Sequence, residues 1–377
     1  MVIAVPEKLG KLSSMPYRSL LAFLLLALSG CSTLDYYAQS IGGHLDLMAR
    51  SHSIDKMLEN PSTANELRQR LVRVQEMRHF ATEPLQLPNN DSYRSYADLE
   101  RKAVVWSVVA TPEFSMKPVT WCYPFVGCAA YRGYFSRQQA DTYAGELREQ
   151  GLDVTVEAVP AYSTLGWFDD PLPSTVIEWP EPYIAGLIFH ELAHQQLYIK
   201  GDSAFNEAFA STVERVGVQR WLTAKGDAAM LVEWRVSRER KHDFISLLLE
   251  SRQRLIDLYA AVASVDEKRL NKQEEFSRLR TEYARLKARW GGGPVYDHWF
   301  KRELSNARLA SIATYEHWVP SFLQLLQEEE GDMGHFYQAS EALAVLPEDE
   351  RRYRMKQLAD KVPAPFSGQL LAPNPPE

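Results

Sequence analysis

The segment Ile188–Gly217, IFHELAHQQLYIKGDSAFNEAFASTVERVG, contains the pattern that decides how the rest of the chain is interpreted. His190 and His194 are four residues apart, so on a helix both imidazoles project from one face. At this spacing the two rings can bind one metal ion, and Glu191 can reach water at that ion without binding the ion itself. The order H-E-x-x-H, here HELAH, therefore predicts a metal-binding helix with a carboxylate placed for acid–base chemistry.

A catalytic zinc ion takes three protein ligands and keeps one position open, so a third ligand has to come from elsewhere in the chain. Glu207, Ser211 and Glu214 follow at i, i+4 and i+7 and form a polar stripe on an otherwise apolar segment. The segment IKGDS turns the chain between the two predicted helices, so the stripe can face the first helix. We expect Glu207 to be the third ligand of one Zn²⁺ ion, and Glu214 to accept a hydrogen bond from a ligand histidine.

Two histidines four residues apart also occur on polar helix faces that bind no metal. Here the preceding segment IAGLIF is apolar, which predicts a buried helix, and an acidic stripe follows at helical spacing. Both features favour the metal site over a solvated pair of histidines.

The first thirty residues have the composition of a targeting segment. Basic residues precede an apolar run, LLAFLLLAL, that is too short to span a bilayer comfortably. The run ends in LSGC, with small residues before Cys31, and this resembles a bacterial lipobox. We expect residues 1–30 to be a lipoprotein signal peptide and Cys31 to become a lipidated N-terminus that anchors the chain to a membrane. An ordinary signal peptide is the alternative. Ser32 after the cysteine favours the outer membrane, so the chain would be an exported lipoprotein on the periplasmic face.

The other two cysteines, Cys122 and Cys128, enclose the segment YPFVG. Disulfides persist in exported proteins, and the proline and glycine between these cysteines suit a tight loop closed by a bridge. Half of a metal site is the alternative, but no histidine lies nearby in the sequence. We therefore predict a Cys122–Cys128 disulfide.

Short segments rich in β-branched and aromatic residues precede residue 160 and predict strands. They are AVVWSVVA (103–110), VTWCYP, AAYRGYF and DVTVEAVP. The segment SRQQADTYAGELREQG predicts a helix that begins at a serine cap and ends at Gly151. The fold class is therefore expected to be α+β and mostly helical, with a small β-sheet before the metal-binding helices.

A long helical hairpin is expected after the metal-binding helices. Residues 227–263 have apolar side chains at helical spacing, and residues 276–290 continue with apolar steps of three and four. The short connection SVDEK between them predicts two antiparallel helices, and the glycines at 291–293 end the second helix.

The chain is expected to form a single zinc-peptidase domain over residues 31–365. Its α+β part would span about 32–180, and its helical part, with the metal site and the hairpin, about 181–365. Residues 366–377 are rich in proline and are expected to be disordered. The net charge is −7 and no basic cluster is present, which argues against a nucleic-acid partner.

The segments HELAHQ and NEAFAS resemble the gluzincin aminopeptidases, in which the glutamate of a similar NEGFAS segment is the third zinc ligand. This resemblance assigns the third ligand to Glu207, with Asn206 beside it as a supporting residue, and implies zincin-type metal helices. The chain departs from the pattern in two ways. The gap between His194 and Glu207 is shorter, and no GxMEN motif lies upstream.

The whole chain resembles a family of bacterial lipoproteins named for aminopeptidase activity. The likeness covers the lipobox, the metal motif and the segments YYAQSIGGHL, TWCYPFVGC, YRGYF and AYSTLGWFDDPL, which together span nearly the full length. It implies a zinc-dependent aminopeptidase of the cell envelope that acts on peptides.

In such a site the zinc ion polarises the scissile carbonyl, and Glu191 moves a proton from water to the leaving amine. The developing oxyanion needs a further hydrogen-bond donor. Gluzincins often supply it from a tyrosine or histidine on a later helix, so Tyr315 is the first candidate. Tyr296 and His317 are alternatives, and each of the three could instead be a packed or surface residue.

Zincins generally place a substrate-binding edge strand before the first metal helix, and AYSTLGWFDDPL (161–172) lies there. Backbone groups of Thr164, Leu165 and Gly166 are expected to pair with an extended peptide. Asp169 or Asp170 could bind the α-amine of a substrate, although a plain Asp-Asp-Pro turn is the alternative.

Three functions remain open at this stage. The first is an aminopeptidase, the second is a metalloendopeptidase of the cell envelope, and the third is a non-catalytic lipoprotein with structural zinc or a helical docking arm. The presence of Glu191 argues against the third, because a structural site needs no general base. The sequence indicates no particular protein partner.

Overall fold

The computed structural model of the 377-residue chain describes residues 35–123, 127–312 and 318–362. The chain divides into two compact units, residues 1–46 and residues 47–377. Residues 35–46, the described part of the first unit, are helical. The predicted signal peptide with Cys31 and the predicted disordered tail lie outside the described residues. Within the described ranges, no helix has both the length and the hydropathy of a membrane span.

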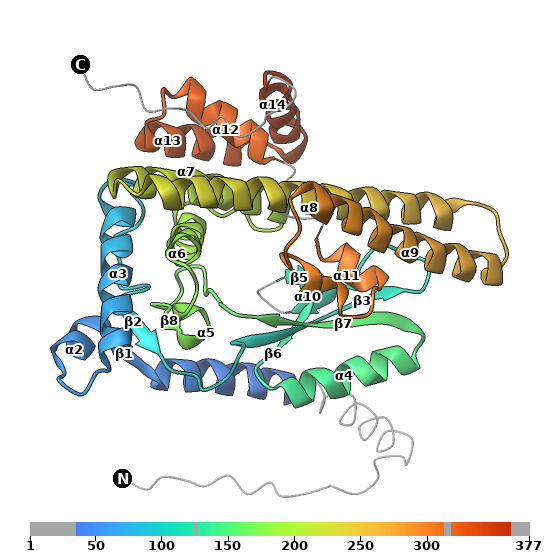
Figure 1. Cartoon of the computed structure of the whole chain (residues 1–377), viewed down its shortest axis with the longest axis horizontal. Coiled ribbons are helices and arrows are strands. Elements are labelled where there is room, and N and C mark those ends of the chain that lie inside the picture. The colour runs from blue at the N-terminus through green and yellow to red at the C-terminus, as the bar shows by residue number, and fades with distance from the viewer. Residues whose placement is uncertain (1–34, 124–126, 313–317, 363–377) are drawn as a thin grey trace, which may run out of the picture. The chain divides into compact units, whose positions relative to one another are not determined.

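The second unit has an α+β fold that is mostly helical, as predicted (Figure 1). One sheet contains β1 (Ser51–Ser53), β2 (Ser95–Ala97) and β8 (Leu172–Pro173) in that order, with β1 and β2 antiparallel and β2 and β8 parallel. A second, antiparallel sheet has the order β6 (Arg132–Tyr134), β3 (Val105–Pro112) and β7 (Leu152–Val159).

The strands predicted at 103–110 and in DVTVEAVP are confirmed as β3 and β7, which pair along their whole lengths from Val105–Val159 to Pro112–Leu152. The helix α4 (Arg137–Glu149) packs against both strands. Its N-terminus is capped by Ser136, as predicted, because the serine Oγ accepts a hydrogen bond from Gln139 N.

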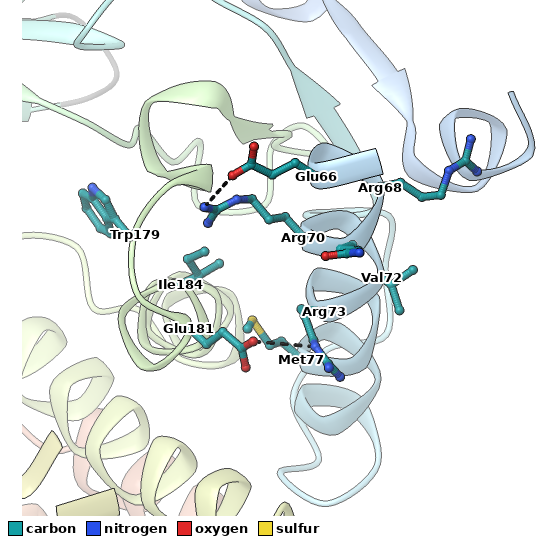
Figure 2. Close-up of a pocket in the computed structure, with 10 residues that line it drawn as sticks. Glu66, Arg68, Arg70, Val72, Arg73, Met77, Trp179, Glu181 and Ile184 are labelled. Carbon is teal, nitrogen blue, oxygen red and sulfur yellow. Dashed lines mark hydrogen bonds and ion pairs between the residues drawn. The ribbon is translucent and has the colours of Figure 1, made fainter. Parts of the chain in front are cut away.

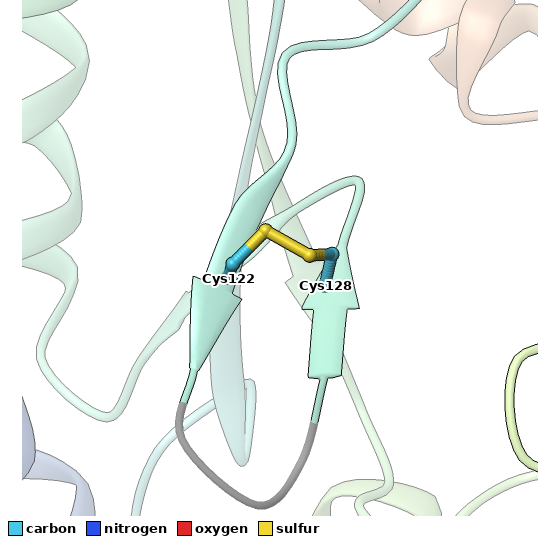
Figure 3. The surroundings of a disulfide bond; sticks show 2 residues. All are labelled: Cys122 and Cys128. Carbon is cyan, nitrogen blue, oxygen red and sulfur yellow. A yellow bond between two sulfur atoms is a disulfide. The ribbon is translucent and has the colours of Figure 1, made fainter.

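The strands β4 (Trp121–Tyr123) and β5 (Gly127–Ala129) form a separate hairpin, in which Cys122 lies directly opposite Cys128. The predicted disulfide joins these two residues (Figure 3).

The helices α6 (Glu181–Gln196) and α7 (Ser203–Ala224) contain the metal-binding motif and pack against each other. Both are buried on nearly all sides, which is why they are apolar around most of their circumference. Two glycines, one on each helix, allow α6 and α7 to approach closely. A methyl group on Gly217 would lie 2.7 Å from the Phe189 ring, and one on Gly186 would lie 3.2 Å from Glu214 Cγ.

The main hydrophobic core surrounds α6 and α7. Helix α3 (Asn65–Thr82) contacts both of them, and α12 (Val319–Glu328) contacts α7 (Figure 1). The remaining helices of this region are α2 (Ile54–Glu59), α5 (Ser174–Ile177), α13 (Met333–Ala344) and α14 (Glu348–Asp360). Arg351 of α14 joins the C-terminal helices to the metal-binding helices, because its guanidinium lies 2.8 Å from the carboxylate of Asp202, the N-cap of α7.

The predicted antiparallel hairpin is formed by α8 (Ala228–Ala260) and α9 (Val265–Arg289). The hydrogen bonds Arg240–Trp290 and Ser251–Glu275 show the antiparallel register. The connection is shorter than expected, because α9 already begins within SVDEK with a capping box at Ser264.

The hairpin is attached to the β3–β7 sheet. Lys272 Nζ lies 2.7 Å from Asp153 Oδ2 and also donates to the Glu113 carbonyl. The short helices α10 (Asp297–Phe300) and α11 (Asn306–Ala310) follow the hairpin, and α11 packs on β3 and β7.

Candidate metal centre

Three side chains from two helices converge, and they are the three predicted as ligands. His190 and His194 come from α6 and Glu207 comes from α7, and their ligand atoms all lie within 4.8 Å of one another. His190 Nε2 is 3.4 Å from Glu207 Oε2, and His194 Nε2 is 3.7 Å from Glu207 Oε1. The two imidazole rings are nearly perpendicular, at 83°.

This arrangement fits a zinc ion. Zinc binds histidine nitrogen and carboxylate oxygen at about 2.0–2.2 Å, so a tetrahedral site holds its ligand atoms about 3.3–3.6 Å apart. The two nitrogen–oxygen distances are close to that range without an ion. Among the described residues, the buried Glu207 Oε2 has no hydrogen bond of normal geometry, as expected of an oxygen whose lone pair faces a cation.

Glu214 supports His190 through the contact that the sequence predicted. Its Oε2 lies 3.2 Å from His190 Nδ1, which leaves His190 Nε2 facing Glu207. The other oxygen of Glu214 accepts a hydrogen bond at 3.2 Å from Arg238 of α8. The carboxylate therefore orients the ring and also joins the hairpin to the centre. Arg238 was not singled out from the sequence.

The two histidines have opposite electrostatic environments. Burial disfavours charge on His190, but the adjacent carboxylates of Glu207 and Glu214 outweigh it and raise the pKa of His190 to about 10. Burial, aided by the neighbouring His190, lowers the pKa of His194 to about 4. His190 therefore lies between two carboxylates, with Glu207 at Nε2 and Glu214 at Nδ1. A divalent cation bound at Nε2 would take the place of a proton next to Glu207, while Glu214 would keep its hydrogen bond to Nδ1.

Glu191 lies on the same helix but does not belong to the ligand cluster. Burial raises the pKa of its carboxyl, while His190 and the hydroxyl of Ser163 oppose the shift. The direction of this shift is the one expected of a carboxylate that acts as a general base, because such a group works best when its pKa is nearer the working pH.

Two loops cover the face of α6 on which Glu191 lies. Gln195 is one helical turn beyond Glu191, and its Oε1 accepts a hydrogen bond at 2.6 Å from Asn90. Gln195 Nε2 donates to Ser92 Oγ at 3.2 Å. From the other loop, a methyl group on Gly166 would lie 3.3 Å from the Gln195 side chain. These contacts place residues 90–92 and the loop around Gly166 beside the predicted general base.

Arg78 organises the first of these loops from inside the core. It is 2% exposed, and its guanidinium donates to the carbonyls of Ser92, Pro88 and Asn90 at 2.7–2.9 Å. Burial lowers its pKa to about 10.

Tyr93 follows in the same loop with a left-handed φ of 62° and a side chain that is 2% exposed. Burial raises the pKa of its phenol, and the carboxyls of Glu191 and Asp170 raise it further, so its hydroxyl lies in the electric field of the predicted base. The sequence contains no signal for Arg78 or Tyr93, because both lie about a hundred residues before Glu191.

Asn206 uses its side-chain amide on the backbone of the turn between the two metal-binding helices. Its amide accepts from Ile199 N and donates to Ile199 O, both at 2.8 Å. It therefore closes the turn between α6 and α7 and positions Glu207 through the backbone.

The expectation of an extended edge strand at Thr164, Leu165 and Gly166 was wrong. Leu165 and Gly166 have φ values of 55° and 83°, which belong to a turn. The carboxylate of Asp170 accepts a hydrogen bond from Thr164 N at 2.8 Å, so this backbone group is already used inside the loop. A substrate contact by this loop stays a prediction, but it cannot take the form of strand pairing along 164–166.

The two aspartates of the loop differ sharply. Asp170 is fully buried and holds the loop together, which leaves it no access to a substrate amine. Asp169 is exposed, so the predicted role in amine binding is available to Asp169.

Two of the three candidate oxyanion donors, Tyr315 and His317, lie outside the described residues. Tyr296 stacks on Phe244 with ring centroids 4.0 Å apart, in the core between the hairpin and α10. Its role as an alternative donor stays a prediction.

A separate pocket of about 550 Å³ lies between α3 and the first turn of α6 (Figure 2). Four of its five charged lining residues are paired with one another: Arg70 with Glu66 at 3.5 Å and Arg73 with Glu181 at 3.6 Å. Glu181 is nine residues before His190, or roughly 14 Å along the helix, so this pocket is distinct from the metal centre.

The fold and the centre together define the class: a mostly helical α+β protein with a two-histidine, one-glutamate cluster and an adjacent carboxyl of raised pKa. Residues 35–355 match the model of the family described as "Putative aminopeptidase". The chain belongs to that family, since the match covers most of its length. Neither the curated proteins nor the solved structures contain a match to the chain.

Proposed function

We propose that the chain is a zinc-dependent aminopeptidase that removes N-terminal residues from peptides at the bacterial cell envelope. The observation that carries the proposal is the convergence of His190, His194 and Glu207 beside Glu191, in a chain of a family named for aminopeptidase activity. Zinc at this centre would supply Lewis acidity for the scissile carbonyl.

The chain's own residues have defined tasks in this proposal. Glu191 takes a proton from the attacking water and returns it to the nitrogen of the leaving amine, so the base is regenerated after each turnover. Glu214 holds the His190 ring by its Nδ1 edge. Asp169, exposed on the adjacent loop, is placed to bind the α-ammonium group of the substrate.

The test compares the zinc-loaded full-length chain with its Glu191→Gln variant on a peptide library, half with free N-termini and half N-acetylated. Glu178→Gln, on the surface before the same helix, is the matched control. Single residues should be lost from unblocked peptides only, and only by the wild type and the control. Cleavage by Glu191→Gln at the wild-type rate would refute the role of Glu191 as the general base. Internal cuts in both pools would make the protein an endopeptidase.

Cell-envelope location is part of the proposal and rests on residues 1–31. Cys31→Ala should abolish incorporation of labelled palmitate and release the protein from the membrane fraction. Labelling that survives this substitution would rule out Cys31 as the lipid site.

A further inference from the structure

Two large aromatic side chains stand in solvent on the loop that covers the metal-binding helix. Trp167 is 86% exposed and Phe168 is 53% exposed. A third, Tyr198, is 48% exposed and lies just after α6. Exposed apolar surface of this size is unfavourable in water, and where it is clustered it commonly marks a binding surface.

The loop holds these aromatic side chains in place through its own hydrogen bonds. Thr164 is the centre of the network: its N donates to the buried Asp170 at 2.8 Å, and its Oγ1 accepts from Phe168 N at 3.0 Å. Trp167 N donates to the Thr164 carbonyl at 3.2 Å. The backbone at Leu165 is left-handed, which is uncommon for a residue with a side chain. The loop is therefore built to present Trp167 and Phe168, not to bury them.

The loop backbone next to Trp167 and the ring of Tyr198 both lie beside the last turn of the metal-binding helix. Gly166, next to Trp167, is in contact with the side chain of Gln195, the residue after His194. The ring of Tyr198 lies 6.2 Å from the ring of His194 in an edge-on arrangement. Tyr198 and the loop that carries Trp167 and Phe168 thus both adjoin the C-terminal turn of α6, which carries the candidate ligand His194.

We propose that Trp167, Phe168 and Tyr198 form an apolar recognition surface for the substrate, so that the enzyme prefers peptides with a large hydrophobic or aromatic residue at the scissile bond. This inference rests on the proposed function and adds the class of substrate. The charge on the loop supports a peptide as the occupant. Asp169, exposed beside Phe168, attracts the ammonium group of a peptide N-terminus and repels an anionic lipid surface.

The kinetic test uses the full-length, zinc-loaded chain and dipeptide amides that differ only in a first residue of Phe, Leu or Ala. Trp167→Ala and Tyr198→Ala are compared with Tyr353→Ala; Tyr353, on α14, is 62% exposed, between Trp167 and Tyr198, and serves as the matched control. In Trp167→Ala and Tyr198→Ala, we expect kcat/KM for the Phe and Leu substrates to fall about tenfold further than kcat/KM for the Ala substrate. The control variant should keep the wild-type ratio of kcat/KM between the Phe and Ala substrates.

An equal fall for all three substrates, or an unchanged Phe-to-Ala ratio in Trp167→Ala, would overturn the inference while leaving the proposed aminopeptidase intact. If the wild type cleaves nothing, the proposed activity fails and the surface is tested by binding alone. A Phe-rich peptide should then bind the chain more tightly than its Ala analogue, and Trp167→Ala should remove the difference. Equal binding overturns the inference. Binding of the Cys31→Ala chain to phosphatidylcholine vesicles that depends on Trp167 would assign the surface to lipid and overturn it as well.

Discussion

Glu214 gives the sharpest quantitative test of the metal centre. Its Oε2 lies 3.2 Å from His190 Nδ1, and its other oxygen accepts from Arg238 at 3.2 Å. Loss of a carboxylate that orients a ligand histidine typically weakens metal binding by about 10–100-fold, or about 1.4–2.7 kcal/mol. Glu214→Gln keeps the size of the side chain and an acceptor oxygen but loses the negative charge, so we expect its zinc affinity to be about tenfold lower. Glu214→Ala also loses the acceptor oxygen, so we expect its zinc affinity to be about a hundredfold lower.

The assay is a zinc titration against a competing chelator of known affinity, at fixed pH and ionic strength. The control is Glu239→Gln, which makes the same charge change at an exposed residue adjacent to Arg238. If long-range electrostatics alone were responsible, Glu239→Gln would lower the zinc affinity as much as Glu214→Gln does. Zinc affinity in Glu214→Ala within about twofold of the wild type would refute the reasoning, since the contact would then have no part in metal binding.

Three further predictions concern stability. Gly217→Ala places a methyl group 2.7 Å from a buried ring, so it should lower the free energy of unfolding by about 1–3 kcal/mol, measured by thermal unfolding; an unchanged Tm would contradict the close approach of α6 and α7. Arg351→Ala breaks a nearly buried ion pair and should cost about 3 kcal/mol in urea unfolding, whereas Arg352→Ala on the surface should cost little. Burial alone would raise the pKa of Glu282, but the guanidinium groups of Arg278 and Arg254 outweigh burial and lower this pKa in the folded state. The ionised Glu282 carboxylate therefore stabilises the folded state above its unfolded-state pKa. This stabilisation is lost as the pH falls through the lower, folded-state pKa. The difference in Tm between wild type and Glu282→Gln should therefore be constant from about pH 7 to pH 5 and shrink as the pH falls below about 4.3, the ordinary pKa of a glutamate. A difference that is unchanged down to about pH 3 would contradict that sign.

The local features of the centre were accessible from the sequence because they depend on helical spacing. Residues four apart share a helix face, so His190 and His194 could be paired without knowledge of the fold. The stripe of Glu207 and Glu214 identified the facing helix for the same reason. The long hairpin followed from its apolar steps of three and four.

The parts that failed or were missed depend on contacts that spacing does not encode. Thr164–Gly166 was expected to be extended, but the Asp170 carboxylate forms a tight turn by hydrogen bonding to Thr164 N. Arg78 and Tyr93 belong to the surroundings of Glu191 because the loop that Arg78 holds contacts α6 through Gln195, which no local pattern reports. Likewise, Arg351 lies about 150 residues from the aspartate with which it pairs.

The most direct measurement is anomalous X-ray diffraction at the zinc absorption edge from crystals of the full-length chain grown with zinc. The account predicts one strong peak about 2.0–2.2 Å from His190 Nε2, His194 Nε2 and a carboxylate oxygen of Glu207, with Glu191 outside bonding distance. A peak at a different set of residues, or none at this cluster in zinc-saturated crystals, would contradict the account.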